Sequence, residues 1–134
     1  MAKFVVDAHA LYWFLSVDSR LGKQAEAVLA DPNSELVLPA IAFAEVVRVA
    51  RKRSKRVSTS QIVRAIELDS RIAVEPLSFE IVVEAEAISE QHGLEMHDSQ
   101  IVATVRLLGQ ATPPVTLISK DEVITAARLV PTLW

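Results

Sequence analysis

The sequence contains no cysteine, which excludes a disulfide, a zinc finger, an iron–sulfur cluster and a cysteine nucleophile. It also has no excess of positive charge. Its formal charge of −3 argues against a protein that coats nucleic acid through bulk positive charge. Near the start, Asp7 and His9 interrupt the apolar residues before they reach the length of a signal peptide or a membrane span, so we expect neither. These absences fit a protein of the reducing cytoplasm.

The residues that are present are typical of one globular domain. The chain has 134 residues, of which 51% are hydrophobic and 23% are charged. A chain of this size buries roughly two-thirds of the surface that its unfolded form exposes. No repeat, low-complexity tract or linker divides it, so we expect a single domain over residues 1–134.

Short β-branched runs alternate with longer amphipathic segments. The expected strands are Lys3 to Asp7, Glu35 to Leu38, Ile72 to Glu75 and Val115 to Ser119, with a further strand possible in the tail after Leu129. Helical patterns separate them, which is the signature of right-handed βαβ crossovers. The sequence therefore predicts a three-layer α/β/α domain with a mostly parallel sheet of four or five strands.

Capping residues predict where two of the helices begin. After a basic turn, Ser58 or Ser60 is expected to cap a helix. A later helix is expected to begin at Asp98 or Ser99 and to end at Gly109.

Four acidic residues stand close to predicted strand ends or helix starts. Asp7 ends the first strand and Asp121 follows the fourth. Glu45 lies about two turns into the helix after the second strand, and Asp98 begins the helix that leads to the fourth. Because ligands of open parallel sheets bind beyond the carboxyl ends of the strands, we expect these acids to converge.

Carboxylates gathered in this way repel one another unless a cation joins them or some of them keep a proton. An all-oxygen site without cysteine favours Mg²⁺ or Mn²⁺. Such a metal supports phosphodiester hydrolysis by activating water and offsetting charge on the phosphate. Structural explanations compete for two of the acids: Asp98 as a helix cap, and Asp121 as a turn residue favoured by the helix dipole.

A basic run follows Glu45 on the same predicted helix. Its first members, which are candidates for contacting an RNA backbone, are Arg48, Arg51, Lys52 and Arg53. The same run can instead be a solvated turn, or bind acidic residues of a protein partner.

The aromatic residues Tyr12, Trp13 and Phe14 are consecutive and cannot share one helix face. We expect Phe14 in the core, and Tyr12 or Trp13 nearer an interface or a substrate groove.

Four segments carry a family resemblance. The run from Asp7 to Leu15, DAHALYWFL, resembles the opening of PIN-domain ribonucleases, especially the toxins of VapBC-type toxin–antitoxin pairs, in which an Asp-Thr-His-Ala-Leu-Leu-Trp pattern recurs. The segments Ile41 to Glu45, Asp98 to Ala103 and Ile118 to Asp121 resemble the later acidic motifs of that family, in the same order. Ala8 departs from the usual Thr or Ser, which removes one hydroxyl near the site.

The resemblance implies a PIN-like fold and a metal-dependent endoribonuclease. By that likeness Asp7, Glu45, Asp98 and Asp121 are the metal-binding acids, and Ser119 supports the site through its hydroxyl. Glu122, next to Asp121, is an alternative fourth acid. The likeness also implies a bacterial or archaeal toxin, a homodimer, and a cognate antitoxin that places a peptide over the acidic groove.

Two other readings remain open. A receiver-like phosphoacceptor domain also binds Mg²⁺ with strand-end acids, but it needs an acidic pair after the first strand, and here Ala8 follows Asp7. Lys120 matches the lysine that such a domain needs after its last core strand. A catalytically inactive PIN-like module that binds RNA or protein is the second alternative.

Overall fold

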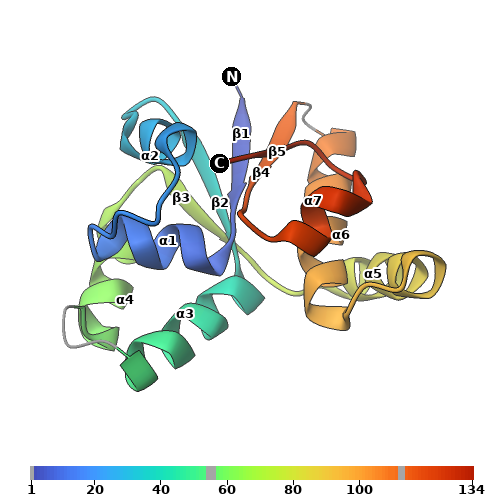
Figure 1. Cartoon of the computed structure of the whole chain (residues 1–134), viewed down its shortest axis with the longest axis horizontal. Helices are drawn as coiled ribbons and strands as arrows, with labels where there is room; N and C mark the ends of the chain where they lie inside the picture. Colours follow the sequence, from blue (N-terminus) through green and yellow to red (C-terminus); the bar gives the residue numbers. More distant parts are fainter. Residues whose placement is uncertain (1, 54–56, 112–113) are drawn as a thin grey trace.

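The computed structural model describes residues 2–53, 57–111 and 114–134, except for the side chain of Arg53. Its elements are β1 (Lys3–Val6), α1 (Ala8–Leu15), α2 (Lys23–Ala30), β2 (Glu35–Pro39), α3 (Ala40–Arg53), α4 (Thr59–Leu68), β3 (Ile72–Glu75), α5 (Phe79–His92), α6 (Met96–Ala111), β4 (Val115–Ile118), α7 (Glu122–Ala127) and β5 (Thr132–Leu133) (Figure 1). Within these ranges, no helix has both the length and the apolar character that a membrane crossing requires.

The five strands form one sheet in the order β3-β2-β1-β4-β5, and every neighbouring pair is parallel. The chain moves from β1 to one edge and then, after β3, crosses to β4 and the other edge. Because crossovers of this kind are right-handed, α1 to α4 cover one face and α5 to α7 the other, as the two groups of helices in Figure 1 show. The predicted three-layer α/β/α fold is confirmed.

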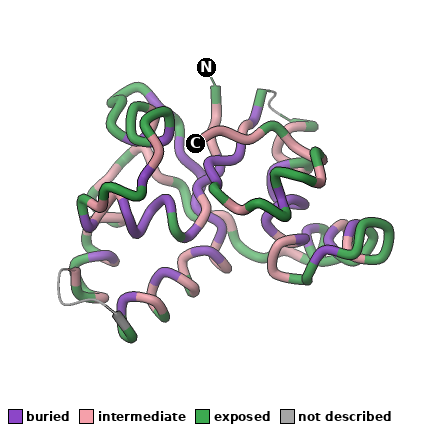
Figure 2. The backbone as a smooth tube through the Cα atoms, in the orientation of Figure 1, coloured by how far each residue is buried: buried purple, intermediate pink, exposed green. Residues whose placement is uncertain are grey.

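The core lies along the three central strands and the inner sides of the helices (Figure 2). Val5, Leu117 and Ile101, from β1, β4 and α6, are each 0% exposed. β1 and β4 lie side by side, but the helices that follow them cover opposite faces. Such a reversal opens a crevice at the carboxyl ends of the two strands.

Two of the predicted helix boundaries are wrong and one is resolved. α6 begins at Met96, because the Ser99 N–H already donates to the Glu95 carbonyl at 2.9 Å, so Asp98 lies inside the first turn and is not the cap. The same helix continues through Gly109 to Ala111. At α4, Ser58 is the cap, and it forms a reciprocal capping box with Gln61.

The expectation for the aromatic residues of α1 is also wrong. Tyr12 and Trp13 are 9% and 8% exposed, whereas Phe14 is only partly buried at the margin of the core. The ring of Trp134 packs edge-on against Trp13, with 5.7 Å between ring centroids. A contact from the far end of the chain therefore covers a side chain that local helix periodicity leaves on the outside.

Candidate active site

Asp7 joins β1 to α1 and caps the helix. One of its carboxylate oxygens, Oδ1, accepts a hydrogen bond from the Ala8 N–H at 2.8 Å, and Oδ2 accepts one from the Ser119 hydroxyl at 2.7 Å. Burial raises the pKa of Asp7 despite these two bonds, and the charge of Glu45 raises it further. The carboxyl group is thus held in place, but its hydrogen bonds and the nearby His9 do not outweigh the effect of burial.

Ser119 links the ends of β1 and β4. Its side chain is buried after β4, and its Oγ accepts the Asp121 N–H at 3.1 Å while donating to Asp7. Asp121 in turn caps α7, because its Oδ1 accepts the Ile124 N–H at 3.0 Å. A single hydroxyl therefore ties two of the predicted acids into a fixed arrangement.

Glu45 projects from α3 and is paired. Its Oε2 lies 2.9 Å from Nε2 of His97, and its Oε1 lies 3.9 Å from the Arg48 guanidinium. The His97 Nε2 atom is buried. Its contact with Glu45 is close enough for an ion pair, but its direction is not that of a hydrogen bond. This close polar contact lowers the pKa of Glu45 and raises the pKa of His97.

Asp98 is a half-buried acid that lies near other acids. Burial, followed by the charge of Asp121, raises its pKa to about 6. Its place in the first turn of α6 favours a negative charge, yet this effect does not outweigh the burial. A carboxyl group in this state gains from any cation that approaches it.

A cleft of about 640 Å³ brings these side chains together. It is lined by Ile41, Ala44, Glu45, Arg48, Glu95, His97, Asp98 and Asp121. Asp7 does not line it, but its charge contributes to the raised pKa of Asp98. Three of the four predicted acids thus share one cleft, and the fourth is coupled to it electrostatically.

The spacing of the acids is not that of a preformed metal cage. Among the described residues, no group of three or more His, Asp or Glu side chains is arranged to hold a metal ion. The donor chemistry nevertheless fits a hard cation, since the donors are carboxylate oxygens. Mg²⁺ keeps several waters and needs only one or two protein carboxylates.

Other candidate residues divide between the cleft and its surroundings. Asp121 faces the cleft, whereas Glu122 lines a different hollow beside Trp134. Of the four basic candidates, Arg48 lines the cleft, Arg51 and Lys52 are exposed further along α3, and the side chain of Arg53 lies outside the described part.

Sequence reasoning missed two residues of the cleft, Glu95 and His97. The available signal was their closeness in sequence to Asp98. Placing the helix start at Asp98 left both of them in the preceding loop.

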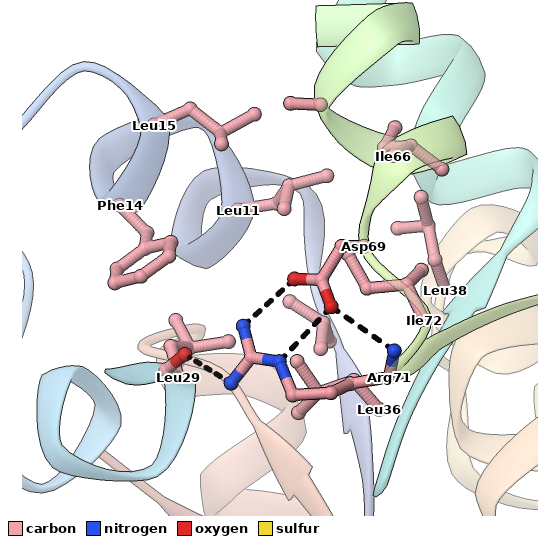
Figure 3. Close-up of a pocket in the computed structure, with 12 residues that line it drawn as sticks. Leu11, Phe14, Leu15, Leu29, Leu36, Leu38, Ile66, Asp69, Arg71 and Ile72 are labelled. Atoms are coloured by element: carbon pink, nitrogen blue, oxygen red, sulfur yellow. Dashed lines mark hydrogen bonds and ion pairs between the residues drawn. The ribbon is translucent and has the colours of Figure 1, made fainter. Parts of the chain in front are cut away.

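A smaller hollow lies between α1, α2, α4 and the sheet (Figure 3). It has a volume of about 80 Å³ and is lined mostly by aliphatic side chains, including Leu11, Leu15 and Leu36. At its margin Arg71 forms an ion pair with Asp69 at 2.7 Å and donates to the Leu29 carbonyl at 2.9 Å. These charges are paired, so this hollow does not offer the acid chemistry of the cleft.

Comparison with known protein families shows to which family the chain belongs. The PIN domain family matches residues 4–128, which is nearly the whole sequence. The chain belongs to the PIN domain family. This assignment agrees with the parallel sheet and favours a PIN-type site over the receiver-like alternative.

Solved structures have the same fold at low sequence identity. VapC20 of Mycobacterium tuberculosis, described as a Sarcin-Ricin loop cleaving toxin, superposes with a TM-score of 0.72 at 19% identity, covering 96% of this chain and 97% of that one. A toxin–antitoxin complex from Klebsiella pneumoniae gives 0.68 at 21% identity, covering 96% and 95%. VapBC2 from Rickettsia felis, bound to promoter DNA, gives 0.67 at 13% identity, covering 99% and 98%. No curated protein matches the sequence.

Proposed function

We propose that this PIN-domain protein is a Mg²⁺- or Mn²⁺-dependent endoribonuclease that hydrolyses RNA phosphodiester bonds. The observation that carries the proposal is the convergence of Glu45, Asp98 and Asp121 on one cleft. Asp7 is coupled to them, and the pKa of Asp98 is raised to about 6. Such an acidic cluster gains stability from a divalent cation and is poorly suited to binding an anion without one.

In this proposal Asp7, Glu45, Asp98 and Asp121 hold the metal. When bound, the cation supplies positive charge that activates water and offsets the charge developing on the phosphate. Ser119 keeps the Asp7 carboxylate oriented through its 2.7 Å hydrogen bond. His97 holds Glu45 on the cleft wall, and Arg48 offers its guanidinium to a phosphate oxygen at the cleft.

The proposed biological role is that of a toxin in a type II toxin–antitoxin pair of the cytoplasm. Support comes from the fold shared with a toxin–antitoxin complex and with a toxin described as cleaving the sarcin–ricin loop. We propose a cognate antitoxin that covers the acidic groove with a peptide, and a homodimeric toxin. A short reading frame directly upstream of the gene would support this role.

The test uses purified protein and a mixed-sequence RNA, with Mg²⁺, with Mn²⁺ and with EDTA. We expect cleavage with either metal and none with EDTA. Calorimetric titration with Mn²⁺ supplies a readout besides activity, and we expect weaker binding by Asp98→Asn. Binding of RNA without cleavage under any metal would instead identify the catalytically inactive module.

A further inference from the structure

Two cations lie over the ring of Trp13. The Arg20 Cζ atom is 4.9 Å from the ring centroid, and the Lys120 Nζ atom is 5.3 Å from it. The ring itself is held from other directions by His9, at 5.3 Å between centroids, and by Trp134, at 5.7 Å. Because Trp13 is 8% exposed, it is a fixed platform rather than a mobile surface side chain.

The two cations differ in how their charge is balanced. Arg20 forms a two-point contact with Asp18, with Nε 3.0 Å from Oδ1 and NH2 2.7 Å from Oδ2. Lys120 is exposed and lies against the Trp13 ring, and within the described part of the chain it makes no ion pair with a carboxylate. The charge of Lys120 is therefore available to an external anion, whereas that of Arg20 is largely neutralised.

The backbone places Lys120 next to the acidic site, and its side chain lines the neighbouring hollow beside Trp134 rather than the cleft itself. It stands between Ser119, which bonds Asp7, and Asp121, which lines the cleft. Trp13 lies on α1, the helix that Asp7 caps, roughly 9 Å further along the helix axis at 1.5 Å per residue. A mobile lysine side chain loses conformational entropy when it binds a ligand. The Trp13 ring reduces that loss because it holds the ammonium group in place beforehand.

We propose that Lys120 binds a phosphate of the RNA strand next to the one that is hydrolysed, and that Trp13 is its positioning residue. This inference rests on the proposed function, because it takes the acidic cleft as the place of hydrolysis. The carboxylates repel the RNA backbone, so a cation beside them provides attraction where the strand enters. An ammonium group suits this task because it acts as a compact point charge for phosphate.

The experiment measures binding of a single-stranded, mixed-sequence RNA oligonucleotide in EDTA over a series of salt concentrations. Lys120→Met keeps an unbranched side chain of nearly the same length and removes the charge, and Lys120→Arg restores a cation. Arg20→Met is the matched control, because it changes the net charge by the same amount beside the same ring. We expect Lys120→Met to lower the slope of log K against log salt by about 0.7, the value for one phosphate contact of a single strand.

At low salt, loss of one such contact weakens RNA binding roughly threefold to tenfold. We expect Lys120→Arg to retain most of the affinity and Arg20→Met to keep the wild-type slope. An unchanged slope in Lys120→Met, an equal fall in Arg20→Met, or a wild-type protein that binds no RNA would each overturn the inference. Failure of the wild-type protein to cleave RNA with Mg²⁺ would contradict the proposed function and leave the binding result standing.

A double-mutant cycle tests the positioning role of Trp13. Trp13→Phe keeps an aromatic side chain but weakens the attraction between ring and cation. We expect Lys120→Met to reduce RNA affinity less in the Trp13→Phe background than in the wild type. Thermal unfolding of all four proteins shows whether they are folded, and strictly additive losses of affinity would show that Trp13 only fills the core.

Discussion

Asp98 in the cleft and Asp69 beside the apolar hollow are both partly buried, but the surroundings of their carboxylates are opposite. Asp69 accepts hydrogen bonds from Arg71 at 3.0 Å through Nε and 2.7 Å through NH2, and the guanidinium holds its pKa below the ordinary value. Asp98 faces Asp121 across the cleft, and burial raises its pKa to about 6. The charge of Asp69 is balanced by Arg71, whereas Asp98 has another acid as its neighbour.

The difference separates stability from function. Arg71 also donates to the Leu29 carbonyl (Figure 3) and to the Asp31 carbonyl, so the paired charge links the end of α2 to the start of β3. The cleft gains nothing comparable from its unbalanced acids, and they make the fold less stable. Folding alone does not require such an arrangement, whereas binding a cation does.

The largest expected effect contrasts the two aspartates directly. We expect Asp98→Asn to reduce RNA hydrolysis by roughly 100-fold or more, because it removes a carboxylate from the metal site. Asp69→Asn is the matched control and is expected to keep the activity within about twofold. Initial rates with Mg²⁺ on one RNA decide the matter, and equal losses in the two variants would contradict the contrast.

The hydroxyl of Ser119 provides the next test. Ser119→Ala removes the hydrogen bond that orients Asp7, and loss of such a supporting contact typically costs about 10- to 100-fold in metal affinity or activity. Ser16→Ala is the control, since the Ser16 hydroxyl is also buried and donates to the Tyr12 carbonyl at 2.7 Å. We expect the Mn²⁺ affinity and the cleavage rate to fall together in Ser119→Ala. In Ser16→Ala we expect neither to change.

The Arg71–Asp69 pair is tested by measuring the stability of the fold. Arg71→Met removes the guanidinium from the Asp69 carboxylate, which keeps the Arg71 backbone N–H, and from the carbonyls of Leu29 and Asp31. The Arg71 side chain is 20% exposed, so we expect a loss of about 2 kcal/mol of unfolding free energy, or roughly 6–8 °C in Tm. Arg20→Met breaks an ion pair whose arginine side chain is 57% exposed, so we expect its Tm to stay close to that of the wild type. Equal Tm values for Arg71→Met and Arg20→Met would contradict the stabilising role of the Arg71–Asp69 pair.

The smallest expected effect is a pH dependence of opposite sign at the two sites, measured in EDTA. The pKa of Asp98 rises from 3.8 to about 6 on folding, so its contribution to stability is complete below pH 3.8 and is lost as the pH rises through 6. Asp98→Asn should therefore gain in Tm relative to the wild type between pH 4 and pH 7. The lowered pKa of Asp69 makes Asp69→Asn less stable than the wild type throughout that range. A constant difference between Asp98→Asn and wild type would refute the raised pKa.

The fold and the positions of the acids were accessible from sequence because both follow from local signals. β-branched runs mark the strands, and Asp7 and Asp121 stand directly after two of them. The pairing of His97 with Glu45 was not accessible, because it depends on where α6 begins and on how it packs against α3. The buried Trp13 depends on Trp134, a contact across the whole chain that helix periodicity does not contain.

The central claim is that the unbalanced carboxylates of the cleft form a cation site. Calorimetric titration of the metal-free protein with Mn²⁺, compared between wild type, Asp98→Asn and Asp69→Asn, tests it most directly. The account predicts saturable binding by the wild type and Asp69→Asn, and binding weakened at least about tenfold in Asp98→Asn. Equal affinity in all three proteins, or no binding by the wild type, would contradict it.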